Sequence, residues 1–206
     1  MKLKSAPRRY TQTARAQSAE ATAQRILDAF LERLMTEWFD EITLDRVAAD
    51  AGVTVQTVLR RFDGKEGLLA DAVKILALQI RARRGAAAAG DIGRLVDGVI
   101  HDYEATGDAV IRLLALEPRH PALKQVLDFG RSEHREWSST GFAEALGKLS
   151  PAVRNRAIDA LVVNTDVYTW KLLRRDMGHS AAETAAMMKC LVGATIAEFT
   201  TPNRKN

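Results

Sequence analysis

The sequence predicts an all-α protein with about nine helices, and this prediction rests on the spacing of its apolar residues. Along most of the 206-residue chain they recur every three or four positions, which is the period of an amphipathic helix. No run of alternating β-branched residues is long enough to indicate a sheet. The chain is 47% hydrophobic and 27% charged, a composition typical of one or two globular domains and not of a disordered protein.

Length, cysteine content and hydropathy exclude several classes of protein. A chain of this length buries about 70% of its unfolded surface, so it needs neither disulfides nor a metal to hold a core. Cys190 is the single cysteine, which excludes an internal disulfide framework and favours a reducing compartment. The first residues contain no apolar stretch of signal-peptide length, and residues 185–199 are too short and too charged to span a bilayer. We therefore expect a cytoplasmic protein with no membrane partner.

Residues 1–20 form a polar leader that we expect to be a basic, flexible N-terminal arm. Its charged side chains are Lys2, Lys4, Arg8, Arg9 and Arg15 against Glu20, an excess of four that equals the formal net charge of +4 of the whole chain. The leader has no hydrophobic period, so nothing in it predicts a packed face. Two interpretations stay open, an arm that contacts a polyanion and a solvated tail.

The first helix is predicted from a single apolar stripe. Ala23, Ile26, Leu27, Phe30 and Leu34 lie at i, i+3, i+4, i+7 and i+11, so they share one helix face. That face must pack against another element.

Two short helices around a glycine are expected next. Thr43 is a good N-cap for the second helix, and Thr54 is a good N-cap for a third helix over Val55–Phe62. Gly52 stands between them, where a residue that tolerates positive φ turns the chain without strain. Two short helices about a glycine turn form a helix-turn-helix.

A long fourth helix is expected from Gly64 or Lys65 to Arg84. Asp63 and Glu66 have the spacing of a capping box. Lys65 would then lie at a helix N-terminus, where backbone amides and the helix dipole already favour an anion. We therefore predict that Lys65 clamps a phosphate.

These residues resemble the tetracycline-repressor (TetR) family of bacterial transcription regulators over about residues 21–80. The resemblance rests on Thr43–Thr54, on Thr57-Val58 and on Phe62–Leu69. It implies a helix-turn-helix DNA-binding domain of three helices at residues 21–66. It also implies a helical effector-binding and dimerisation domain at residues 67–206.

Nine side chains of this segment are the predicted DNA contacts. Five lie at helix starts or on the face that the resemblance implies meets the phosphate backbone: Thr43, Thr54, Thr57, Arg61 and Lys65. Gln56 and Arg60 lie at i and i+4 on one exposed face of the third helix, where glutamine suits adenine and arginine suits guanine. Val55 and Leu59 repeat that spacing and could touch thymine methyl groups, although Leu59 suits a core position equally well.

Two positions depart from the family pattern. Leu59 stands where the family usually has tyrosine, and Arg61 stands where it has histidine or tyrosine. Arg60 and Arg61 could supply backbone contacts in place of the aromatic ring, since a guanidinium binds phosphate through two hydrogen bonds.

Five further helices are expected at about residues 91–105, 107–117, 121–147, 150–176 and 180–199, with Gly107 and Gly178 as helix ends. The last two are apolar on more than one face, and a second subunit is an economical partner for such helices. The resemblance implies a homodimer joined through these two helices, and we expect Val167 and Trp170 at the interface. The alternative is that both faces are interior to one subunit.

Catalytic and metal sites are not predicted. Glu117-Pro118-Arg119-His120 is the only Glu-x-x-His, and Pro118 and Pro121 disrupt the helix that a di-iron site would need. Cys190 lies on an apolar face and suits a small core residue better than a nucleophile. No glycine-rich phosphate loop follows a strand. We therefore expect no enzyme, no metal and no cofactor.

A small-molecule pocket is implied by the resemblance, and its candidate residues are the polar and aromatic side chains of inward helix faces. They are Tyr103, His134, Trp137, Thr165, Asp166, Tyr168 and Trp170. Each of them taken singly suits a core or interface position better than a ligand contact.

The sequence thus predicts a homodimeric, ligand-responsive DNA-binding transcriptional regulator. Its simplest form is a repressor that a small-molecule effector releases from a pseudo-palindromic double-stranded DNA operator. Two alternatives stay open. One is a helical enzyme or small-molecule carrier on the same fold, and the other is a DNA-binding regulator without a ligand.

Overall fold

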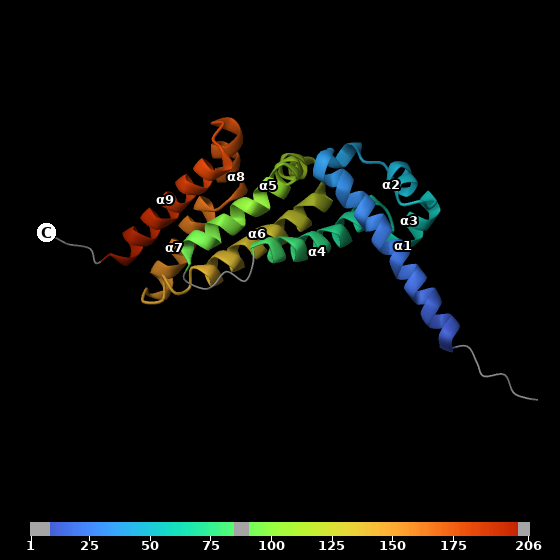
Figure 1. The fold of residues 1–206 in the computed structure, drawn as a ribbon, viewed down its shortest axis with the longest axis horizontal. Coiled ribbons are helices and arrows are strands. Elements are labelled where there is room, and N and C mark those ends of the chain that lie inside the picture. The colour runs from blue at the N-terminus through green and yellow to red at the C-terminus, as the bar shows by residue number, and fades with distance from the viewer. Residues whose placement is uncertain (1–8, 85–90, 202–206) are drawn as a thin grey trace, which may run out of the picture. The chain divides into compact units, whose positions relative to one another are not determined.

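The computed structural model of the protein describes residues 9–84 and 91–201 (Figure 1). These residues form helices and turns, with no strand among them, so the predicted all-α class is confirmed. The chain divides into two compact units between Lys74 and Ile75, inside helix α4. The predicted boundary lay earlier, at residues 66 and 67. The first turns of α4 belong with the first unit, where Leu68, Leu69 and Ala72 are fully buried.

The first unit consists of α1 (Arg9–Thr36), the 3₁₀ turn η1 (Phe39–Glu41), α2 (Leu44–Asp50), α3 (Val55–Phe62) and the first half of α4 (Lys65–Arg84). The predicted stripe of the first helix is buried at Ile26, Leu27, Phe30 and Leu34. From α2 and α3 the core receives Val47, Val58 and Phe62. Helix α2 packs against both α1 and α3, which fixes the helix-turn-helix.

Helix α1 begins earlier than the sequence predicts. Its first residue is Arg9, so residues 9–20 of the predicted flexible arm are helical, while residues 1–8 lie outside the described residues. Residues 14–20 include several good helix formers, and a helix nucleated by a buried face extends through them at little cost.

The predicted caps of α2 and α3 are confirmed. The Thr43 hydroxyl accepts a hydrogen bond from the Arg46 amide at 3.4 Å, and the Thr54 hydroxyl accepts one from the Thr57 amide at 3.3 Å. Gly52 has a φ of +65°, as its place in the turn requires. Asp63 has a different role from the predicted N-cap of α4, because it closes α3 in the left-handed conformation with a φ of 56°.

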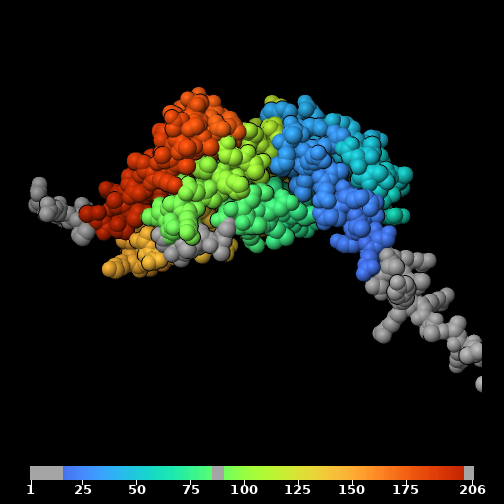
Figure 2. Space-filling view, in the orientation of Figure 1, coloured from blue at the N-terminus to red at the C-terminus, as the bar shows by residue number. Residues whose placement is uncertain are grey.

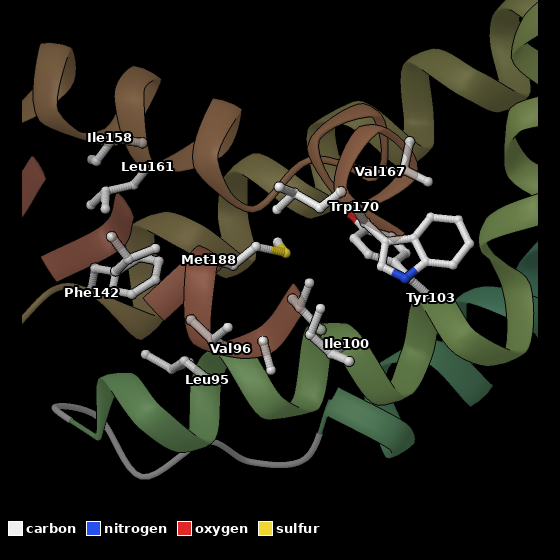
Figure 3. Close-up of a cluster of buried hydrophobic side chains, with 14 of the residues drawn as sticks. Leu95, Val96, Ile100, Tyr103, Phe142, Ile158, Leu161, Val167, Trp170 and Met188 are labelled. Atoms are coloured by element: carbon white, nitrogen blue, oxygen red, sulfur yellow. The ribbon is translucent and has the colours of Figure 1, made fainter. Parts of the chain in front are cut away.

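The second unit contains α5 (Ile92–Leu116), the 3₁₀ turn η2 (Glu117–Arg119), α6 (Pro121–Gly141), α7 (Pro151–Asn164), α8 (Val167–Lys171), the π-helical segment η3 (Leu172–Asp176) and α9 (Ala181–Thr200). Helix α5 packs along α8 and α9, and α7 packs between α6 and α9. The space-filling view shows α5 in yellow-green against α9 in red (Figure 2). Figure 3 shows the core between these helices, in which Leu95, Phe142, Leu161 and Met188 are buried.

Three predicted helix boundaries in this unit are wrong. Helix α6 ends at Gly141 and not at residue 147. Gly107 does not end a helix, because α5 continues through it to Leu116. Its role is close packing, since a Cβ atom at this position would lie 2.4 Å from Cζ3 of Trp170. The predicted helix over 150–176 breaks at Thr165, and the Asp166 carboxylate caps the new helix α8 by accepting from the Tyr168 amide at 2.9 Å.

The break after α7 also changes which side chains face outward. Val167 and Trp170, expected at a subunit interface, are 5% and 0% exposed and belong to the core of one subunit. The apolar side chains that reach the surface here include Val163, Leu172 and Leu191, at 64%, 48% and 42% exposure. Cys190, expected in the core, is exposed on α9. Gly178 ends its segment with a φ of +75°, as predicted.

Among the described residues, no helix is long and apolar enough to cross a membrane.

Candidate nucleic-acid interface

Helix α3 separates a buried face from an exposed one. Val58 and Phe62, one turn apart, are 0% and 7% exposed and anchor the helix. Gln56 and Arg60, also one turn apart, are exposed on the opposite side. Leu59 is 39% exposed, so it is not a core residue. The exposed face of α3 therefore presents an amide, a guanidinium and an apolar side chain.

A groove runs between α1 and α3 and has a volume of about 500 Å³. Its walls are Ser18, Ala19, Thr22, Arg25, Val53, Thr54, Thr57, Arg60 and Arg61. Three of these side chains are guanidinium groups, four carry hydroxyls, and none carries a carboxylate. The groove thus brings together four of the predicted DNA contacts with residues of α1.

The α1 side of the groove was not found by sequence reasoning. Ser18, Thr22 and Arg25 follow one another at helical spacing, three or four residues apart, and this polar stripe beside the apolar stripe of Ile26 and Phe30 was the available signal. The spacing within α1 could not predict that α3 forms the opposite wall of the groove, because α3 is about 30 residues away along the chain.

Lys65 is placed differently from the predicted phosphate clamp. Its ammonium donates to the carbonyl of Phe39 at 2.7 Å, to that of Ile42 at 2.9 Å and to that of Asp40 at 3.4 Å. It also lies 4.4 Å from the centre of the Phe39 ring, and burial lowers the pKa of its ammonium. All three donors of the ammonium are directed at backbone oxygens, so Lys65 ties η1 to the start of α4.

The remaining predicted contacts lie around this site. Thr43 is exposed at the start of α2, outside the groove, and Val55 is half-buried. The hydroxyls of Thr54 and Thr57 lie 3.0 Å apart and are hydrogen-bonded to each other.

Ion pairs between α1 and α2 hold the helix-turn-helix in place. Arg33 pairs with Asp50 at 2.5 Å and with Glu37 at 2.7 Å, while Arg46 pairs with Glu37 at 2.6 Å. Arg33 is only 17% exposed, so this network is partly shielded from solvent. The cations of this network are therefore paired within the protein, unlike those of the groove.

In the second unit, the predicted pocket residues join a buried polar cluster at the end of α4. Arg84, 9% exposed, pairs with the buried carboxylate of Asp102 at 3.0 Å. It also lies 3.1 Å from Nδ1 of His134, whose Nε2 lies 3.1 Å from the Thr165 hydroxyl. The Tyr103 hydroxyl donates to the Thr165 carbonyl at 3.1 Å. Arg83 pairs with the other oxygen of Asp102, also at 3.0 Å. Sequence reasoning found Tyr103, His134 and Thr165 but missed the three charged residues.

The protonation state of His134 follows from its neighbours. Burial, together with the nearby Arg84 cation, lowers the pKa of its imidazole to about 3. The ring is therefore neutral, and Nδ1 accepts from Arg84, because a guanidinium can only donate. Nε2 then carries the proton and donates to Thr165, whose hydroxyl donates onward to the Leu161 carbonyl at 2.7 Å.

The other predicted pocket residues occupy different positions around the cluster. The Trp137 ring stacks on His134 with centroids 5.5 Å apart, and its buried Nε1 has no partner among the described residues. The rings of Trp170 and Tyr103 lie side by side (Figure 3), with centroids 5.8 Å apart. Nε1 of Trp170 donates to Glu104. Asp166 caps α8, and burial raises the pKa of its carboxyl. Tyr168 is 56% exposed and lies outside the cluster.

No group of three or more histidine, cysteine, aspartate or glutamate side chains is placed to hold a metal ion in the part of the chain that the structure describes.

Residues 26–72, which include the C-terminal part of α1, the helix-turn-helix and the start of α4, match the family model described as bacterial regulatory proteins, tetR family. The resemblance to the TetR family is confirmed. A comparison with curated proteins finds no match.

Solved structures share this fold over nearly the whole chain. A tetR-family transcriptional regulator from Streptomyces coelicolor is 16% identical, with a TM-score of 0.68, over 87% of this chain and 88% of its own. A transcriptional regulator from Rhodococcus sp. Rha1 is also 16% identical, with a TM-score of 0.65, over 90% of this chain and 100% of its own. At these identities the likeness is one of fold. That fold and the TetR-family match are those of transcriptional regulators.

Proposed function

We propose that this protein is a DNA-binding transcriptional regulator, most simply a repressor, that docks α3 in the major groove of its operator. The observation that carries the proposal is the exposed face of α3, which lies inside the segment that matches the TetR family. Arg60 on this face makes no ion pair or hydrogen bond within the described residues. A free guanidinium beside Gln56 suits base reading, since arginine pairs with guanine and glutamine with adenine.

Selection from a pool of random duplexes with the purified protein tests this function. We expect a pseudo-palindromic site whose half-sites lie about 34–36 Å apart, as two symmetric recognition helices require. Arg60→Ala should cost about 1–3 kcal/mol at one base pair and relax the preference there. A uniform loss of affinity over all single-base variants would show that Arg60 contacts the DNA phosphate backbone and not a base. If no common site is selected, the proposed function is wrong.

A homodimer is the second part of the proposal, and exposed apolar side chains of α7, η3 and α9 support it. Val163 and Leu191 are 64% and 42% exposed, and Asn164 joins their helices by donating to the Leu191 carbonyl at 3.2 Å and to the Thr195 hydroxyl at 2.7 Å. A second copy of the chain would cover these side chains.

Light scattering of charged variants tests the dimer. Val163→Glu should produce monomers, because an unpaired carboxylate in an apolar interface is strongly unfavourable. Leu78→Glu is the matched control, since Leu78 is equally exposed at 64% but lies on α4. A wild-type mass of one subunit at micromolar concentration would remove this part of the proposal.

Response to a small-molecule effector is the third part, and the buried polar cluster around Arg84 and His134 supports it. Pockets that recognise small molecules combine apolar walls with a few placed polar groups, as the aromatic rings and polar atoms of this cluster do. A thermal-shift screen should find compounds that raise the unfolding temperature, and those compounds should weaken operator binding. Stabilising compounds that leave operator affinity unchanged would argue against an effector role.

A further inference from the structure

The groove between α1 and α3 holds more hydrogen-bond donors than its own residues can satisfy. Nε of Arg61 is buried and has no partner in the described part of the chain. Arg25 makes two long hydrogen bonds of 3.4 Å, to the Ala51 carbonyl and to the Thr22 hydroxyl. A guanidinium has five N–H donors, so most donors of these two side chains remain available to a ligand.

The chemistry of the walls selects an anion with several oxygens. Arginine forks bind phosphate oxygens through paired hydrogen bonds, and the hydroxyl of Ser18 can add a further donor. The absence of a carboxylate among the wall residues leaves the positive charge of the guanidinium groups uncompensated. The groove therefore fits a phosphate group, carried either by DNA or by a free phosphorylated molecule.

We propose that the groove clamps a backbone phosphate of the operator, with Arg25 of α1 and Arg61 of α3 as its two cations. This inference rests on the proposed function, because it needs α3 to face bases. A duplex whose bases meet Gln56 runs its sugar-phosphate strand along the flank of α3, and that flank is a wall of the groove. The Lys65 ammonium donates to the carbonyls of Phe39 and Ile42. We therefore assign the contact with the DNA backbone that was predicted for Lys65 to Arg25 of α1.

The test measures operator affinity of the full-length protein between 50 and 200 mM salt. Each neutralised phosphate contributes a slope of about −0.9 to log affinity against log salt, which is about 3.5-fold over this range. Arg25→Gln should make the loss of operator affinity between 50 and 200 mM salt about 3.5-fold smaller than in the wild type. It should also weaken binding equally for all single-base operator variants. Arg25→Lys, which keeps the charge, should restore the slope.

Arg119→Gln is the matched control, because Arg119 is an exposed arginine on η2 in the second unit and its loss changes the net charge equally. It should leave the slope unchanged. Circular dichroism of each variant should show the wild-type helix content, so that a change in affinity is not a change in folding.

The outcomes separate the two proposals. If the wild-type protein selects an operator and Arg25→Gln keeps the wild-type slope and affinity, the phosphate clamp is overturned and the proposed function stands. A loss confined to one base pair would make Arg25 a base contact and also overturn the clamp. If the wild-type protein selects no DNA, both proposals fail together.

A separate titration with inorganic phosphate and adenosine monophosphate distinguishes the two sources of phosphate. Weak binding of both, above millimolar, is expected for a groove that uses a duplex to position its phosphate. Submillimolar binding that Arg25→Gln abolishes would assign the groove to a free phosphorylated ligand and overturn the assignment to DNA.

Discussion

Replacing Lys65 by methionine separates a structural lysine from a phosphate clamp. Methionine keeps the stem that covers the Phe39 ring and removes only the ammonium, which donates to carbonyls at 2.7 and 2.9 Å. The Phe39 carbonyl retains one partner, because it also accepts from the Ile42 amide at 3.4 Å. The substitution therefore removes two short charged hydrogen bonds and one long one.

The expected cost of Lys65→Met is about 2–3 kcal/mol of unfolding free energy. A hydrogen bond with a charged partner is worth about 1.5–3 kcal/mol. The partial exposure of this site and the remaining partner of the Phe39 carbonyl keep the total near the value of one such bond. Urea denaturation of the full chain measures this loss. Lys74→Met is the matched control on the same helix, since Lys74 is 72% exposed and pairs only with Asp71 at the surface, so its loss should cost less than about 1 kcal/mol.

Operator affinity then decides what the Lys65 ammonium binds. With its donors on the carbonyls of η1, Lys65→Met should leave the salt slope of DNA binding unchanged under conditions where the variant is folded. A phosphate clamp would instead lower the slope by about 0.9. Wild-type stability together with a reduced slope would refute the structural role.

Three further predictions concern the second unit. The pKa of His134 is about 3 in the folded protein and near 6.5 in the unfolded chain, so between these values only the unfolded chain takes up the proton. The free energy of unfolding should therefore fall by about 2 kcal/mol from pH 7 to pH 5. Urea denaturation at several pH values should show this loss in the wild type and not in His134→Gln. Gly107→Ala should lower the free energy of unfolding by about 1–3 kcal/mol or more, because the new Cβ would lie 2.4 Å from Trp170. Gly130→Ala is the control, since a Cβ there has nothing within 4 Å, and it should stabilise α6 by about 0.5–1 kcal/mol. Equal effects of the two substitutions in thermal melts would contradict the packing argument. Asp102→Asn leaves Arg83 and Arg84 without their buried counter-charge and should cost about 3–5 kcal/mol of unfolding free energy. The surface control Asp71→Asn should cost less than about 1 kcal/mol, and a small loss in both variants would mean that the two arginine cations are not desolvated.

The sequence by itself determined the helix-turn-helix of the first unit and the buried face of α1. The caps at Thr43 and Thr54, the turn at Gly52 and the buried stripe of α1 depend on residues within one or two helical turns of each other. Such signals are local, so they can be read along the chain. The pattern of the helix-turn-helix, from which the resemblance to the TetR family was taken, is local in the same sense.

Only the tertiary structure decided what the long polar side chains bind. Lys65 meets carbonyls 23–26 residues away, Gly107 of α5 packs against Trp170 of α8, and the groove brings Arg25 and Arg61 together. The break at Thr165, which buries Trp170 and exposes Val163, also depends on packing. Hydrophobic periodicity fixes which face of a helix is inward but not which neighbour covers it, and a flexible cationic side chain takes whichever oxygen the fold brings within reach.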